Sequence, residues 1–313
     1  MKRRAHPFFW LLLAALALLV WGPLWFMAGG SLMPLDELDT LLGPVLTGRA
    51  GSAAWTLLPS WPTLEPLAQL LLDTPEFFVM FWNTCAQVLP QVLGQFLVGA
   101  PAAWALSRLR FRGRGALTAL YMALMLLPFQ VTMVPSYLVL YRLGLMDTVW
   151  AIILPGAFSA FPVFIMARGF DAVPRALLEA ASLDGAGHFT TFWRVGLPLG
   201  APGILAALVL GFLEAWNAVE QPMVFLKDQS IWPLALYLPR INAENLGLCM
   251  AASLMMLAPA ALIFLFGQKY LELGIQASSR YFWPNKKMSA AGASIIRLAA
   301  MHRPRFSALM RGR

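Results

Sequence analysis

Charged residues are scarce in this sequence of 313 residues: Asp, Glu, Lys and Arg together make up 12% of it, while 59% of the residues are hydrophobic. Soluble domains carry about 25% charged residues, because their surfaces face water. A chain with so little charge and so many apolar residues is not expected to fold as a soluble domain. The composition instead indicates a protein of the lipid bilayer.

Cysteine and histidine are also rare, with two and three copies. Cys85 and Cys249 lie in or beside apolar blocks and form no CxxC pair, which argues against a disulfide framework or a zinc site. The histidines, His6, His188 and His302, are far apart in sequence, whereas metal and catalytic sites need groups that converge. We therefore expect neither a metal site nor an intramembrane enzyme.

The chain lacks the GxxxxGK[ST] phosphate-binding loop that many ATPases share. Without this loop the chain is not expected to hydrolyse ATP by that mechanism. We expect no catalytic residue and no bound cofactor in this chain.

Apolar residues occur in six blocks of about 20, which is the length that a helix needs to cross roughly 30 Å of hydrocarbon. This pattern predicts an all-α, multi-pass integral membrane protein with six transmembrane helices. The expected spans are Phe8–Ala28, Thr84–Leu106, Ala116–Val134, Val149–Ala167, Gly203–Gln221 and Leu248–Gly267.

Lys and Arg are unevenly distributed between the segments that connect these spans. Nineteen of the 23 fall on one side of the membrane if the N-terminus is cytoplasmic. Such a bias predicts that both the N-terminus and the C-terminus lie inside. It also explains the net charge of +8 as a consequence of topology, so we do not expect nucleic-acid binding. The exceptions, on the outer side, are Arg49, Arg142, Lys227 and Arg240.

These spans divide the chain into four parts. Residues 1–28 form the cytoplasmic N-terminus and first span, 29–83 a long external loop, 84–274 the membrane core, and 275–313 a basic cytoplasmic tail. The external loop is rich in proline, which breaks long helices. It either caps its own subunit or meets a partner, because loops of this length usually cover or bind something. The tail is expected near anionic lipid headgroups.

The inner segment 169–198, between the fourth and fifth spans, predicts a short rigid helix. Pro174 suits a first helical turn, Arg175–Leu183 are mostly good helix formers, and Asp184 and Gly185 end the helix. Such a rod measures roughly 15 Å at 1.5 Å per residue. A stiff rod of this kind can transmit force from a separate protein, whereas a flexible loop would absorb the motion.

A second short helix is expected from His188 to Val195. Gly196 and Pro198 then favour a turn that leads the chain back to the membrane.

Several motifs in this segment resemble the EAA loop of binding-protein-dependent ABC import permeases: Glu179-Ala180-Ala181, Asp184-Gly185-Ala186 and Leu197-Pro198-Leu199, with Pro202. Asn83-Thr84 and Trp216-Asn217 resemble the carbohydrate permeases among them, in particular the six-span partner of maltose-type importers. The resemblance covers about 70% of the chain, from Trp61 to Gly274.

This resemblance implies a non-catalytic permease subunit in a bacterial inner or plasma membrane. Its partners would be a second permease subunit, two copies of a cytoplasmic ATPase that uses the ATP, and an extracytoplasmic solute-binding protein that delivers a sugar. The alternative for Glu179 is a helix-supporting pair with Arg175, four residues earlier. The residues implied in ATPase coupling are Pro174, Glu179, Ala180, Ala181, Asp184, Gly185, Leu197 and Pro198.

Polar residues in the fifth span predict a substrate pathway. Glu214, Asn217 and Gln221 fall at i, i+3 and i+7 on one helix face, with Glu220 beside them and Trp216 as a stacking surface for sugar rings. Charged groups inside a bilayer should face protein, water or cargo. Two alternatives remain open: these residues hold permease subunits together, or Glu214 and Glu220 are ion sites of an ion-coupled secondary transporter.

Overall fold

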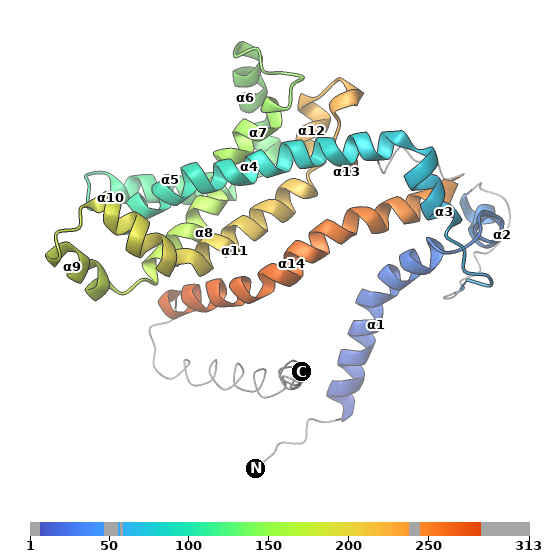
Figure 1. Ribbon diagram of the computed structural model, residues 1–313, viewed down its shortest axis with the longest axis horizontal. Coiled ribbons are helices and arrows are strands. Elements are labelled where there is room, and N and C mark those ends of the chain that lie inside the picture. Colours follow the sequence, from blue (N-terminus) through green and yellow to red (C-terminus); the bar gives the residue numbers. More distant parts are fainter. Residues whose placement is uncertain (1–6, 47–55, 57–58, 238–244, 283–313) are drawn as a thin grey trace, which may run out of the picture.

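The computed structural model describes residues 7–46, 56, 59–237 and 245–282, and this part of the chain contains helices and no strand (Figure 1). The helices along the N-terminal half are α1 (Pro7–Gly30), α2 (Leu35–Leu46), α3 (Glu65–Ala68), the π-helix η1 (Gln69–Asp73), α4 (Pro75–Arg108), α5 (Arg114–Leu126), α6 (Phe129–Arg142) and α7 (Trp150–Ala157). The remaining helices are α8 (Ala160–Asp171), α9 (Arg175–Leu183), α10 (His188–Thr191), the π-helix η2 (Phe192–Gly196), α11 (Leu197–Trp216), α12 (Glu220–Phe225), the 3-10 helix η3 (Gln229–Ile231), α13 (Leu234–Tyr237) and α14 (Leu246–Phe282).

The centre of the bundle is formed by α4, α8, α11 and α14, which run along the long axis of the molecule (Figure 1). At the end nearest α9, the rings of Trp104, Phe170 and Phe192 pack edge to face or tilted, with centroids 5.3–6.2 Å apart. Aromatic rings prefer such offset and edge-to-face arrangements. This cluster joins α4, α8 and the start of α11 into one packed unit.

Glycine permits a close contact between two helices of this centre, α8 and α11. A Cβ added to Gly203 would lie 2.4 Å from the Cα of Gly169, so the two backbones touch with no side chain between them. Small residues allow this close approach, which strengthens packing where the hydrophobic effect cannot drive helices together.

The prediction of a multi-pass helical membrane protein is confirmed. Among the described residues, five continuous stretches are long and apolar enough to cross a bilayer: Trp10–Gly30, Pro75–Arg108, Trp150–Asp171, His188–Trp216 and Leu246–Leu273. The third expected span, Ala116–Val134, is not one straight helix. It contains the junction of α5 and α6, whose axes differ by 105°.

Several predicted boundaries differ from the structure. The second span begins at Pro75 instead of Thr84, because Pro75 suits the first turn of a helix. The expected turn at Gly196 and Pro198 is wrong, since α10, η2 and α11 form one continuous helix. The π-turn of η2 alters the hydrogen-bond ladder just before Pro198, where the proline lacks an N–H.

The start of the predicted tail is also different, because α14 continues to Phe282. Residues 283–313, which make up the rest of the expected basic tail, lie outside the described residues.

The described part of the external loop folds onto its own subunit at the end of the bundle opposite α9 (Figure 1). Ser60 donates hydrogen bonds from its backbone N–H (3.1 Å) and hydroxyl (2.8 Å) to the Glu37 carboxylate. The backbone N–H of Thr63 donates to the Leu32 carbonyl at 2.9 Å. These contacts favour the interpretation of this loop as a cap.

Candidate functional site

A cavity of about 600 Å³ lies where the chain leaves helical conformation between consecutive helices at three places. The interruptions are the α5–α6 junction at Leu127 and Pro128, the α7–α8 junction at Phe158 and Ser159, and the stretch between α11 and α12. Each junction contributes residues to the cavity wall. Segments that are far apart in the sequence therefore converge on one hollow in the bundle.

The sequence explains the sharpest interruption. A proline disfavours helical conformation in the residue before it, and Leu127 is extended with φ −74° and ψ 125°. Pro128 is also extended, with φ −67° and ψ 152°, so the helix restarts at Phe129 in a new direction. Non-helical backbone is tolerated at membrane depth only where it is buried in protein or lines a water-filled space. The interruptions thus indicate that this cavity is a polar, hydrated part of the molecule.

Amide side chains from α4 form one wall of the cavity. Gln91 and Gln95, one helical turn apart, both line it, and the side-chain Nε2 of Gln95 donates to the Gly156 carbonyl at 3.0 Å. The Oε1 atom of Gln95 is buried and has no hydrogen-bond donor among the described residues. Sequence analysis missed both glutamines, although their four-residue spacing within an apolar span was a usable signal. Hydroxyl groups add to the lining: Thr132, Ser136 and Ser159.

Two carboxylates also line the cavity. Glu220, in the first turn of α12, accepts hydrogen bonds at 2.9 Å from the Gln130 side-chain amide to both of its oxygens. Glu214, in the last turn of α11, is exposed and makes no hydrogen bond or ion pair within the described part of the chain. Its carboxylate is therefore available to a molecule in the cavity.

The structure brings four of the five predicted pathway residues to this cavity: Glu214, Asn217, Glu220 and Gln221. They do not share one helix face, because α11 ends at Trp216 and Gln221 reaches the cavity from α12. Asn217 lies in the connection and donates from its side chain to the Leu213 carbonyl at 2.8 Å. Their contact with cargo stays a prediction.

Trp216 is elsewhere, and the expectation that it stacks on sugar rings is wrong for this arrangement. Its side chain is buried, its indole N–H donates to the Met256 carbonyl at 3.1 Å, and its ring stacks on Phe212 with centroids 5.4 Å apart. Two residues along a helix correspond to about 200°, so Trp216 points away from Glu214. It packs the interior between α4, α11 and α14.

The predicted rod is present as α9, which lies at one end of the molecule (Figure 1). Pro174 precedes the helix in an extended conformation and does not form part of its first turn. Gly185 has φ +80°, a left-handed conformation that side-chain-bearing residues rarely adopt. Glu179 and Ala180 are exposed on the helix, and the apolar side chain of Leu183 is 89% exposed. These side chains are therefore free of contacts that would bury them within the described part of the chain.

The base of α9 is fastened to the end of α4. The Arg108 guanidinium donates hydrogen bonds to the carbonyls of Phe170 and Val173, and the Ser107 hydroxyl donates to the Asp171 carboxylate at 2.9 Å. Charge-assisted hydrogen bonds of this kind are among the stronger ones in proteins. The rod is therefore attached to the helix that carries Gln91 and Gln95.

The remaining predicted coupling residues do not all lie on α9. Ala181, Asp184 and Gly185 belong to its end. Leu197 and Pro198 start α11, where Leu197 packs on the aromatic cluster around Trp104 and Pro198 is exposed.

Residues 95–276 match the family model described as binding-protein-dependent transport system inner membrane component. The arabinooligosaccharides transport system permease protein AraQ of Halalkalibacterium halodurans is 26% identical over 69% of this chain and 79% of its own length. The polygalacturonan/rhamnogalacturonan transport system permease protein YtcP of Bacillus subtilis is 30% identical over 63% of this chain and 68% of its own length.

A solved structure has the same fold. It is that of a bacterial ABC transporter involved in the import of the acidic polysaccharide alginate, and it superposes with a TM-score of 0.72 at 23% identity. The match covers 86% of this chain and 99% of that chain.

Proposed function

Since this chain belongs to the family of binding-protein-dependent transport system inner membrane components, we propose that it forms part of the pathway by which a carbohydrate crosses the bacterial inner membrane. The observation that carries this proposal is the cavity at the three helix interruptions. It has the size of a small-molecule site, which is typically about 300–1,000 Å³. Its amides, hydroxyls and carboxylates suit a cargo rich in hydroxyl groups.

The names of the relatives support a carbohydrate cargo. AraQ is named for arabinooligosaccharides and YtcP for polygalacturonan and rhamnogalacturonan. A cavity lined with hydrogen-bonding groups can replace the water that a saccharide loses inside the membrane, because buried polar groups need partners.

The chain works with partners in this proposal. A second permease subunit closes the open side of the cavity, and an extracytoplasmic solute-binding protein delivers the cargo. Two copies of a cytoplasmic ATPase use the ATP, and α9 docks onto one of them. Closure of the ATPases would move α9, and through the contacts of Arg108 the end of α4, so that the cavity faces alternate sides of the membrane.

The proposal is tested by uptake in proteoliposomes that contain the complete complex, with the binding protein outside and ATP inside. Labelled saccharide should accumulate only when ATP is enclosed, and it should still accumulate when ionophores remove the proton and sodium gradients. Uptake that follows an ion gradient and ignores ATP would instead support the ion-coupled alternative based on Glu214 and Glu220.

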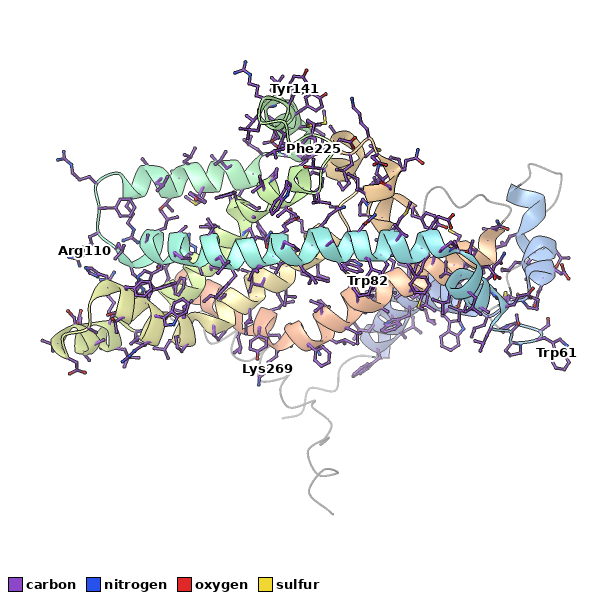
Figure 2. The ribbon with its side chains drawn as sticks, turned by 45° about the horizontal axis from the view of Figure 1, so that its top comes forward. Trp61, Trp82, Arg110, Tyr141, Phe225 and Lys269 are labelled. Carbon is purple, nitrogen blue, oxygen red and sulfur yellow. The ribbon has the colours of Figure 1, made fainter. Side chains whose placement is uncertain are left out.

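We also propose that both termini are cytoplasmic and that α9 lies inside. Figure 2 shows Arg110 at the α9 end of the molecule and Trp61 at the other end. Cysteines in the variants Trp61→Cys and Leu183→Cys, at side chains that are 80% and 89% exposed, should react with a membrane-impermeant maleimide from opposite sides. The background replaces Cys85 and Cys249 with alanine. Labelling of both positions in intact cells would contradict this orientation.

A further inference from the structure

We infer that the cavity selects its cargo by charge, admitting neutral or cationic saccharides and rejecting those that carry carboxylates. This inference rests on the proposed function and deepens it, because it names the class of carbohydrate. It is carried by the ionisable groups of the cavity wall and by the partners that they have.

The wall is acidic. Glu214 and Glu220 both line the cavity, and among the described residues that do so there is no Lys, Arg or His. Arg142, at the end of α6, and Lys227, after α12, belong to neighbouring segments but are not part of the lining. This subunit therefore offers a cargo two negative groups and no positive one.

The negative charge is not neutralised within the described part of the chain. Glu220 is bonded to Gln130, whose amide is neutral and leaves the carboxylate charge in place. Glu214 has no hydrogen-bond or ion-pair partner among the described residues. The ion pair of Arg168 with Asp171 lies at the base of α9, and neither residue lines the cavity.

Charge of this kind separates saccharide classes. A hydroxyl or ammonium group of the cargo can donate to Glu214 in a strong, charge-assisted hydrogen bond. A uronate would instead bring a like charge next to two carboxylates, and it would give up part of its hydration with no cation in the wall to replace it. Neutral and amino sugars therefore gain a hydrogen-bond acceptor in this cavity, whereas a uronate loses water molecules that no cation of the wall replaces.

The relatives are named for saccharides that differ in charge. Galacturonan and alginate are polymers of uronic acids, whereas arabinooligosaccharides carry no charge. On this ground the cargo of the present chain should be of the uncharged type for which AraQ is named, and not of the type named for YtcP or for the solved alginate transporter.

The first test is uptake by the complete complex in the proteoliposomes described above. Arabinotriose serves as the neutral probe, the glucosamine dimer as the cationic probe, and digalacturonate as the anionic probe. We expect ATP-dependent uptake of a neutral or cationic probe and none of digalacturonate. ATP-dependent import of digalacturonate would overturn the inference while leaving the proposed function intact.

A second test reads the charge of the cavity without knowledge of the cargo. A single cysteine in the variant Ser136→Cys, in a chain without Cys85 and Cys249, is treated with cationic and anionic methanethiosulfonate reagents. The ratio of the cationic to the anionic reaction rate should be at least about tenfold higher at Ser136→Cys than at the exposed control, Trp61→Cys. Adding Glu214→Gln should reduce that preference several-fold.

Each of the two tests has an outcome that would overturn the inference. A rate ratio at Ser136→Cys equal to that of the control, or one unchanged by Glu214→Gln, would overturn the inference even if no probe is imported. If no saccharide is taken up with ATP, the proposed function fails, yet the reagent rates still report whether the wall is negative.

Discussion

The variant Gly185→Asp should lose ATP-driven uptake almost completely while still inserting into the membrane. Gly185 has φ +80°, where a side chain costs roughly 1–2 kcal/mol, although Asp tolerates this region better than most residues. Apart from the two neighbouring residues, no heavy atom of the described residues lies within 4 Å of the Cβ that the substitution adds. The new carboxylate, next to that of Asp184, would therefore act mainly on a protein that docks at the end of α9.

The measurement combines co-purification of the ATPase with uptake in vesicles. Gly144→Asp is a matched control, because Gly144 also has a positive φ (67°) and open space around its Cβ, but it follows α6 and is far from α9 in sequence. This control should retain the ATPase. Glu179→Ala should have a mild effect, because an exposed ion pair between this carboxylate and the docked ATPase would contribute about 0–1 kcal/mol. Full ATPase retention together with full uptake in Gly185→Asp would overturn the assignment of α9 as the coupling helix.

The variant Gly203→Ala should destabilise the folded chain and lower the yield of monodisperse protein in detergent. Its added methyl group would lie 2.4 Å from the Cα and 3.1 Å from the backbone N of Gly169. Backbone atoms cannot rotate away as a flexible side chain can, so α8 and α11 must move apart. Overpacking of this kind costs about 1–3 kcal/mol, equivalent to a fall in the thermal midpoint of roughly 2–5 °C for a chain of 313 residues.

Gly115→Ala and Gly22→Ala are the matched controls for this effect. Both glycines lie within helices, and a Cβ added to either meets no described heavy atom within 4 Å beyond its chain neighbours and the adjacent backbone of its own helix. These variants should unfold at the temperature of the unmodified chain or slightly above it, because alanine favours helix over glycine. A Gly203→Ala variant as stable as these controls would mean that α8 and α11 do not cross in contact.

The sequence was sufficient to predict most of the fold, because the length of an apolar block directly reports a membrane span. The rod at α9 was also predictable, since Gly185 marks the left-handed turn that ends it. The bend between α5 and α6 was not predicted. Pro128 signals an interruption, but the direction of α6 depends on its packing against α12, which is far away in sequence.

The candidate site was predicted only in part. Glu214 and Glu220 stood out because carboxylates are costly in apolar segments, and both line the cavity. The stacking role of Trp216 failed because residues two apart on a helix point in nearly opposite directions. Gln91 and Gln95 were missed although their four-residue spacing marks a polar face of α4. The cavity that this face lines arises from the convergence of α4 with the interrupted helices, which no single segment of the sequence reveals.

The open, polar wall of the cavity has a consequence for biogenesis. A subunit that reaches the membrane before its partner would present Glu214 and the interrupted backbone to lipid, and a charged group near the bilayer centre costs about 2.5–3.5 kcal/mol. A partner that covers this wall stabilises the folded chain by mass action. Orphan copies made in excess should therefore be short-lived, and the cell can match the abundance of the two subunits by degrading whichever is left unpaired.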